Sequence, residues 1–334
     1  MGVGGAIAFA TVSGFPARAA ALLAMTLGNL GLTNFGHSAS HFGISRRTWI
    51  NRALLLLTFG GTFGTSATWW VNKHIVVHHT TPNVIGLDDD VALLPWFALT
   101  EDEVRSGGPW RRWYYRYQWA LLPFAVALTA VSMIVSSWRY LGAALRDRRR
   151  RTALHVADAG SIVAHFTLWI GVPLLWFHAT EVIGFYLLRG ALLGCAVFFT
   201  AAPAHFPAEA RFLSTEGHDD RGAYRRRSDF ILLQTATTVN FRAGWIGTWF
   251  CCGAQHQIEH HLFPGISHAY YPRMSPVVRA YCEANGYPYQ SVGWVEGIWK
   301  SLRVFWRPKP VVPALHTLRE RSLREQMPLE SAGV

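Results

Sequence analysis

Four apolar stretches of the chain approach the length that an α-helix needs to cross a lipid bilayer, about 20 residues. They cover residues 20–36, 119–138, 161–177 and 184–204. A fifth stretch, residues 53–70, is also apolar, but Gly60, Gly61 and Gly64 weaken it as a lipid-facing helix. Hydrophobic residues make up 51% of the chain and charged residues only 15%, which is below the roughly 25% of soluble domains. The sequence therefore predicts an all-α integral membrane protein and excludes a disordered or disulfide-rich chain.

The chain is basic, with a formal net charge of +11. Because the basic residues accompany long apolar stretches, contact with anionic lipid and the positive-inside rule explain the charge better than nucleic-acid binding does. The four cysteines show no CxxC spacing, and Cys251 and Cys252 are adjacent, which favours a reducing compartment and a packing role. We therefore expect contact with membrane lipid and no nucleic-acid partner.

Fifteen histidines are the unusual count in this composition, and more than half of them lie in three clusters. The clusters read GHSASH (His37, His41), KHIVVHH (His74, His78, His79) and HQIEHH (His256, His260, His261). On a helix, an i, i+4 spacing places two imidazoles on one face, where both can bind one ion. An adjacent pair directs its second ring about 100° around the helix, toward a second ion or an opposing helix. Imidazole suits Fe, Zn, Cu and Ni, whereas Mg and Ca prefer oxygen ligands.

The remaining histidines carry weaker signals. His205 ends the last apolar stretch, at a depth where an ionisable group is costly unless it is used, although an interfacial histidine bound to water is an equal alternative. Glu259 lies inside the third cluster and either orients a ligating imidazole or is a solvated helix residue. We expect structural or surface roles for His155, His165, His178, His218, His268 and His316.

The topology follows from requiring the three clusters to lie on one side of the membrane. Residues 53–70 are then expected to form an interfacial or partly buried helix rather than a span. The run Arg146–Arg151, broken only by Asp147, follows residues 119–138. With that run in the cytoplasm, 119–138 becomes interfacial and the last two apolar stretches form a membrane hairpin. Their connection, residues 178–183, is then outside, and the histidine clusters face the cytoplasm.

The two ends of the chain differ from its middle. Only residues 3–12 are strongly apolar before the first span, so a partner helix there is shorter than a full crossing needs. From Arg307 onward the sequence is proline-rich and then charged, which is typical of a mobile end. We therefore expect one membrane-embedded domain over residues 1–306 and a polar tail over residues 307–334.

The clusters and the segments that follow them resemble the membrane fatty acid desaturase family. QIEHHLFP (257–264) is similar to the third histidine box of the front-end and related acyl desaturases, in which Gln replaces the first His. Similar segments are SRRTWIN (45–51), HHTTPNVIGLDDD (78–90), QTATTVNF (234–241) and HAYYPRMSPVVRAYCEANGYPY (268–289). The likeness extends over roughly residues 20–290, and the combination of boxes is far more specific than any single one.

The resemblance implies a helical membrane fold with a cytoplasmic di-iron site that uses O₂ and two electrons to dehydrogenate a fatty acyl chain. Gln257 occupies the variable first position of the third box, and His256 directly before it recreates the HxxxHH spacing, so either is the ninth ligand. Carried over by position, the implied iron ligands are His37, His41, His74, His78, His79, His205, Gln257, His260 and His261.

The resemblance also implies a separate electron donor, a ferredoxin or a cytochrome b5 with its reductase. Arg225, Arg226 and Arg227 are candidates for docking an acidic donor, although such arginines also set topology and contact anionic lipid. A bacterial protein of this kind belongs in the plasma or inner membrane. Hydroxylation or triple-bond formation on a similar chain remains an alternative reaction, and a non-catalytic membrane protein that binds metal or haem is an alternative of another class.

Overall fold

The computed structural model describes residues 1–215 and 227–312. The described chain is mostly helical. The helices of its first half are α1 (Gly2–Thr11), α2 (Phe15–Ser40), α3 (Thr48–Leu55), η1 (Leu56–Phe63), α4 (Ala67–Trp70), η2 (Val71–His78), α5 (Glu101–Ser106), α6 (Pro109–Tyr117), η3 (Gln118–Leu121) and α7 (Leu122–Arg146). Those of its second half are α8 (Ala153–Phe166), η4 (Thr167–Gly171), η5 (Pro173–Leu175), α9 (Ala179–His205), α10 (Arg227–Thr237), α11 (Gly244–Cys251), α12 (Gln257–Leu262), η6 (His268–Tyr270), α13 (Tyr271–Asn285) and α14 (Trp294–Arg303).

Four helical segments are long and apolar enough to cross a membrane: Phe15–Ser40, Pro109–Arg146, Ala153–Leu175 and Ala179–His205. They contain three of the four apolar stretches recognised in the sequence and all but the last two residues of the fourth, 161–177, and 53–70 is not among them. The expected membrane-protein fold is therefore confirmed. Pro109–Arg146, which contains residues 119–138, is itself long and apolar enough to be a span. The interfacial position expected for 119–138 therefore stays a prediction. α1 has 10 residues, too few for a span, and it packs along α2.

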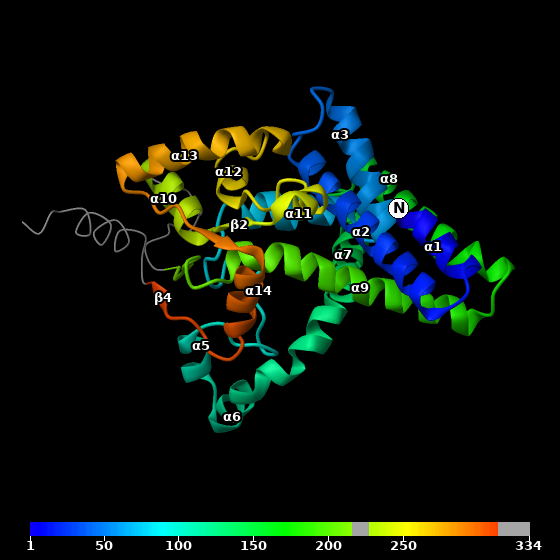
Figure 1. Ribbon diagram of the computed structural model, residues 1–334, viewed down its shortest axis with the longest axis horizontal. Helices are drawn as coiled ribbons and strands as arrows, with labels where there is room; N and C mark the ends of the chain where they lie inside the picture. Colours follow the sequence, from blue (N-terminus) through cyan, green and yellow to red (C-terminus); the bar gives the residue numbers. More distant parts are fainter. Residues whose placement is uncertain (216–226, 313–334) are drawn as a thin grey trace, which may run out of the picture.

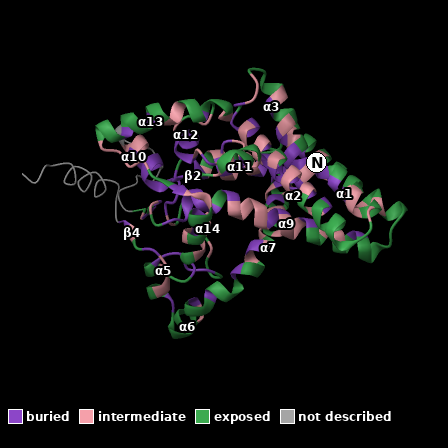
Figure 2. Ribbon diagram, in the orientation of Figure 1, coloured by how far each residue is buried: buried purple, intermediate pink, exposed green. Residues whose placement is uncertain are grey.

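The N-terminal helices and α9 lie toward one side of the molecule, and the helices that follow α9 lie toward the other. In Figure 1, α1, α2 and α9 extend to the right, while α12, α13 and α14 lie to the left of them. Two short parallel sheets, β1 (Phe212–Leu213) with β4 (Val311–Val312) and β2 (Asn240–Arg242) with β3 (Ser291–Gly293), join segments of this second region. Figure 2 shows buried residues concentrated around β2 and α12.

Residues 48–78 fold back between α2 and α8 as a broken helix. η1 ends at Phe63, and α4 begins at Ala67. Gly64 makes this break possible, because its φ of 86° is in the left-handed region. A Cβ at Gly64 would also lie 2.7 Å from Nε2 of His165. The segment is thus a partly buried helix, one of the two forms expected for residues 53–70, and it returns the second histidine cluster toward the first.

The folded part of the chain continues past the boundary expected at residue 306. Val311–Val312 pairs with β1, and the buried Lys309 side chain donates hydrogen bonds to the carbonyls of Pro207 (3.0 Å) and Ala210 (2.5 Å). These contacts attach residues 307–312 to the loop that follows α9. The sequence reading missed them because a proline-rich segment gives no signal for partners about one hundred residues away. The rest of the expected tail lies outside the described residues.

The expected membrane hairpin has a direct test. Ala179 is exposed at the first turn of α9, at the opposite end of that helix from His205. In a background without the four native cysteines, we expect Ala179→Cys to react with an impermeant maleimide only from the outside. Arg149→Cys, in the arginine run, is the matched position and should react only from the cytoplasm. Labelling of Ala179→Cys from the cytoplasmic side alone would refute this orientation.

Candidate metal centre

Four segments that are far apart in the sequence bring their histidines together. His37 lies in the last turn of α2 with His41 just after it, and the second cluster is carried by η2. His205 is the last residue of α9, and α12 carries the third cluster. The ligand atoms form two groups, within each of which all atoms lie within 4.8 Å of one another: His37, His41, His74, His79 and His260 in the first group, and His78, His205 and His261 in the second.

The three histidines of the second cluster are distributed between the two groups. The i, i+4 spacing predicts that His74 and His78 share one ion, but they lie in different groups. His79 joins His74 in the first group, and His78 lies in the second. The reason is that η2 is a π-helix, in which the His79 amide donates to the His74 carbonyl at 3.0 Å, five residues back. The i, i+4 rule for an α-helix therefore does not apply here. His74 and His78 do approach each other in company with Asp90, but that carboxylate is ion-paired with Lys73 at 2.8 Å.

In the first group, imidazole nitrogens face one another at short distances, as the ligands of one cation do. Nε2 of His74 lies 2.7 Å from Nε2 of His37 and 3.1 Å from Nε2 of His79, which in turn lies 3.0 Å from Nε2 of His260. A neutral imidazole has one donor and one acceptor nitrogen, so these facing nitrogens cannot all be well satisfied by one another. Nε2 of His41 is buried without any hydrogen-bond partner among the described residues. A metal ion fits this arrangement.

The second group has the same character. Nδ1 of His205 and Nε2 of His261 are buried and have no hydrogen-bond partner in the described part of the chain. Nε2 of His205 lies 2.9 Å from Nε2 of Gln257. Gln257 is thus placed beside this group, at the position implied for the ninth ligand. The donor set is nitrogen-rich, which suits a transition metal rather than Mg or Ca.

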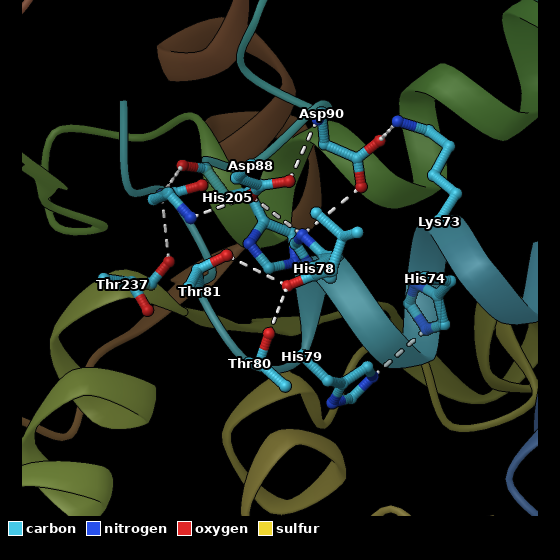
Figure 3. A network of polar contacts seen from close by, with 12 residues as sticks. Lys73, His74, His78, His79, Thr80, Thr81, Asp88, Asp90, His205 and Thr237 are labelled. Carbon is cyan, nitrogen blue, oxygen red and sulfur yellow. Dashed lines mark hydrogen bonds and ion pairs between the residues drawn. The ribbon is translucent and has the colours of Figure 1, made fainter. Parts of the chain in front are cut away.

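Polar side chains behind the imidazoles fix the orientation of the rings. Asp88 is fully buried and lies 2.9 Å from Nδ1 of His78, while Asp90 lies 3.3 Å from the same atom. Figure 3 shows both carboxylates beside His78, with Lys73 reaching Asp90. Gln234 accepts from Nδ1 of His261 at 2.7 Å. Such partners hold the tautomer and the ring plane of a metal ligand.

Tyr271 is a further partner of this kind, with its hydroxyl 3.3 Å from Nδ1 of His260. Asp88, Gln234 and Tyr271 were not singled out as functional residues by the sequence reading. The sequence did carry one signal for a functional role of these three residues, because each lies inside a segment that resembles the desaturases.

The electrostatics of the centre favour neutral imidazoles. Burial, reinforced by the neighbouring imidazoles, lowers the pKa of the ring well below its ordinary value at His41, His74, His79, His260 and His261. For His78, burial also acts to lower the pKa, but the carboxylates of Asp88 and Asp90 outweigh it and raise the pKa overall. Because a metal binds the deprotonated nitrogen, the five rings whose pKa is lowered are ready for a cation at neutral pH, whereas the raised pKa of His78 means that a metal competes there with a proton.

His256 and Glu259 are not placed as the sequence reading suggested. His256 precedes α12 with a non-helical backbone, and its Nδ1 meets Oγ of Ser275 at 2.9 Å, outside both groups. Glu259 is fully buried, but its carboxylate accepts from Asn240 at 2.8 Å and from Tyr289 at 2.6 Å. It therefore fixes α12 to neighbouring segments and does not contact a histidine of either group. The helix begins at Gln257, one residue after His256, so of the two alternatives for the ninth ligand it is Gln257 that lies beside the second group.

The other predicted positions fall into two sets. His165 is buried and contacts the Gly61 carbonyl and the Tyr186 hydroxyl, at 3.0 and 2.9 Å, away from the centre. His155, His178 and His268 also lie outside both groups. Arg225, Arg226, His218 and His316 lie outside the described residues, and Arg227 is the first residue of α10.

Comparison with known proteins gives one family. The family model for fatty acid desaturases matches residues 13–293, which includes every histidine of the two groups. The sn-1 linoleoyl-lipid 6-desaturase of Synechocystis sp. is 29% identical over 279 residues, covering 77% of this chain and 70% of that protein. Fatty acid desaturase 3 of Homo sapiens is 30% identical over 266 residues, covering 76% of this chain and 53% of that protein.

An acyl-lipid (7-3)-desaturase of Chlamydomonas reinhardtii is 31% identical over 281 residues, covering 80% of this chain. The chain spans about half the length of two of these relatives, 51% of the Chlamydomonas protein and 53% of the human one. It spans 70% of the Synechocystis protein.

Proposed function

The chain belongs to the fatty acid desaturase family of oxidoreductases, and from this premise we propose that it introduces a carbon–carbon double bond into a fatty acyl chain. The observation that carries the proposal is the convergence of eight buried or half-buried histidines in two groups. The reaction consumes a CH₂–CH₂ unit, O₂, two electrons and two protons, and it yields CH=CH and two waters. No side-chain acid or base removes hydrogen from an unactivated methylene, so a redox metal is required.

We further propose that the metal is iron and that each group holds one ion. The ligands would be His37, His41, His74, His79 and His260 for one ion, and His78, His205, His261 and Gln257 for the other. Imidazole ligands also suit zinc, but zinc has no redox chemistry. When bound, the two irons supply the oxidant for dehydrogenation.

The protein's own residues supply position and protection. Asp88, Gln234 and Tyr271 hold the rings of His78, His261 and His260 in the orientation that directs the other ring nitrogen into its group. Burial limits the access of water, which would otherwise compete for the oxidant, and it keeps neutral the rings of His41, His74, His79, His260 and His261. The acyl chain must reach the two groups from the side of the membrane-spanning helices. We propose a cytoplasmic position for the histidines and a separate electron donor.

Lipid analysis after expression is the test of this function. In a host that lacks the activity, supplied with a ferredoxin-type donor, we expect gas chromatography with mass spectrometry to show new unsaturated fatty acids. A strain that expresses the His260→Ala variant at the same level is the matched control. New hydroxylated or acetylenic chains in place of alkenes would overturn the reaction class, and iron-loaded, membrane-inserted protein that yields no new lipid would overturn the function.

A further inference from the structure

We propose that Asp158 and Arg189 act together as a clamp of opposite charges that positions the helix bearing the second histidine cluster. The clamp acts at the break between η1 and α4, residues 64–66, which we call the helix break. Both residues lie on membrane-spanning segments, and neither belongs to the metal centre. The inference rests on the proposed function, because the helix that it positions carries three proposed metal ligands.

Asp158 holds the start of the helix that follows the break. Its side chain is fully buried on α8, and it accepts four hydrogen bonds. Two come from the backbone amides of Ala67 and Thr68, both at 2.9 Å, and two from the hydroxyls of Ser66 and Thr68, at 2.6 and 2.7 Å. The first amides of a helix have no partner within it and carry partial positive charge, so a carboxylate satisfies both needs.

Arg189 holds the end of the helix that precedes the break. It projects from α9, is 2% exposed, and donates from Nη2 to the carbonyl of Thr62. Its guanidinium carbon lies 3.9 Å from the centre of the Trp169 ring, a cation–π contact that is strongest when it is desolvated. The last carbonyls of a helix are unpaired and carry partial negative charge, so a cation is the matching group.

The two charges therefore match the two helix ends that meet at the break, and neither forms an ion pair with a described side chain. His165 packs against the helix break at Gly64, with Nδ1 at the Gly61 carbonyl and Nε2 at the Tyr186 hydroxyl. Hydrogen bonds to buried charges are stronger than neutral ones, and a buried charge that loses its partners is costly. Any slip of the broken helix along its axis would leave both charges without these partners.

This constraint reaches the metal centre through a short, continuous helix. α4 continues into η2 with helical backbone angles at Val71, so Thr68 and His74 lie six residues apart on one continuous helix. A slip of one residue along this helix would rotate His74, His78 and His79 about the helix axis and shift them along it by on the order of 1 Å. Metal sites tolerate deviations of only about 0.5 Å. Asp158 and Arg189 are thus positioning residues for these ligands.

The experiment measures metal affinity in folded protein, with Co²⁺ as the probe. We expect Asp158→Asn and Arg189→Gln each to weaken Co²⁺ binding by about 10- to 100-fold, the range for residues that support ligands, and to change the visible Co²⁺ spectrum. Ser66→Ala removes one of the four donors and should have a smaller effect in the same direction, which keeps the test available if the charge variants fold poorly.

Gln118→Leu is the matched control. Gln118 is fully buried and makes three hydrogen bonds, to Ala98 and Phe305, far from the helix break. It should lower thermal stability without changing Co²⁺ affinity or spectrum. Clamp variants that lose stability but retain the wild-type Co²⁺ affinity and spectrum would overturn the proposal and leave the proposed function intact. Failure of wild-type protein to bind Co²⁺ at all would overturn the proposed metal centre and the clamp with it.

Discussion

Replacement of His260 by alanine is expected to reduce desaturation by more than about 100-fold while the protein remains folded in the membrane. Loss of a residue that only supports a ligand costs 10- to 100-fold, and His260 is itself a proposed ligand of the first group. His78→Ala should have an equal effect through the second group. Wild-type protein purified in detergent should contain two irons per chain, and each variant should contain fewer, as measured by elemental analysis.

His256→Ala is the matched control for this prediction. His256 lies in the same box, four residues before His260, but its ring contacts Ser275 and belongs to neither group. It should retain most of the activity and the full iron content. A His256→Ala variant as inactive as His260→Ala, or a His260→Ala variant with two irons and normal turnover, would contradict the assignment of ligands. Zinc alone in wild-type protein after anaerobic iron supply would contradict iron.

Repeated turnover is expected to require a redox partner protein. Each double bond consumes two external electrons, and NAD(P)H delivers a hydride that isolated irons cannot divide into single electrons. Purified protein with O₂, acyl substrate and NAD(P)H should therefore remain inactive until a ferredoxin or cytochrome b5 and its reductase are added. The measurement is product formed per enzyme over many turnovers, and multiple turnovers without a partner would contradict the dependence.

The salt dependence of this electron delivery tests where the partner docks. An acidic donor is steered toward a basic surface, and this steering weakens as the screening length falls to about 8 Å at physiological salt. We expect electron delivery to slow between low and physiological salt. Replacing Arg225 to Arg227 by glutamine should reduce that salt dependence, whereas Arg149→Gln, in the other arginine run, is the comparison. An unchanged salt dependence would remove Arg225 to Arg227 from the docking surface.

Features encoded by local pattern were predictable from the sequence. Helices long enough to span the membrane coincide with apolar stretches, because a run of about 20 apolar residues has few other solutions. The histidine clusters converge as expected, since spacing within a box and the requirement for one side of the membrane limit the arrangement. The glycines of residues 53–70 argued against a lipid-facing span there, but they did not predict the break at Gly64.

Features that depend on distant partners were not predictable. The pairing of His74 with His79 follows from a π-helix, which has no reliable sequence pattern. Asp158 and Arg189 are single charged residues in apolar surroundings, and nothing local shows that they meet Thr68 and Thr62. Glu259 has the spacing of a residue that supports a ligand, but its orientation toward Asn240 and Tyr289 depends on the packing of α12.

The distribution of the metal groups along the chain has a consequence for biosynthesis. The first group needs His37 near the beginning and His260 near the end, and the second needs His78 and His261. Neither set is complete until the ribosome has made nearly all of the described chain and all four candidate spans have been inserted. If the proposed metal centre forms, its ions therefore bind after all four candidate spans have been synthesised, and the imidazoles of the earlier segments remain without metal until α12 has been made.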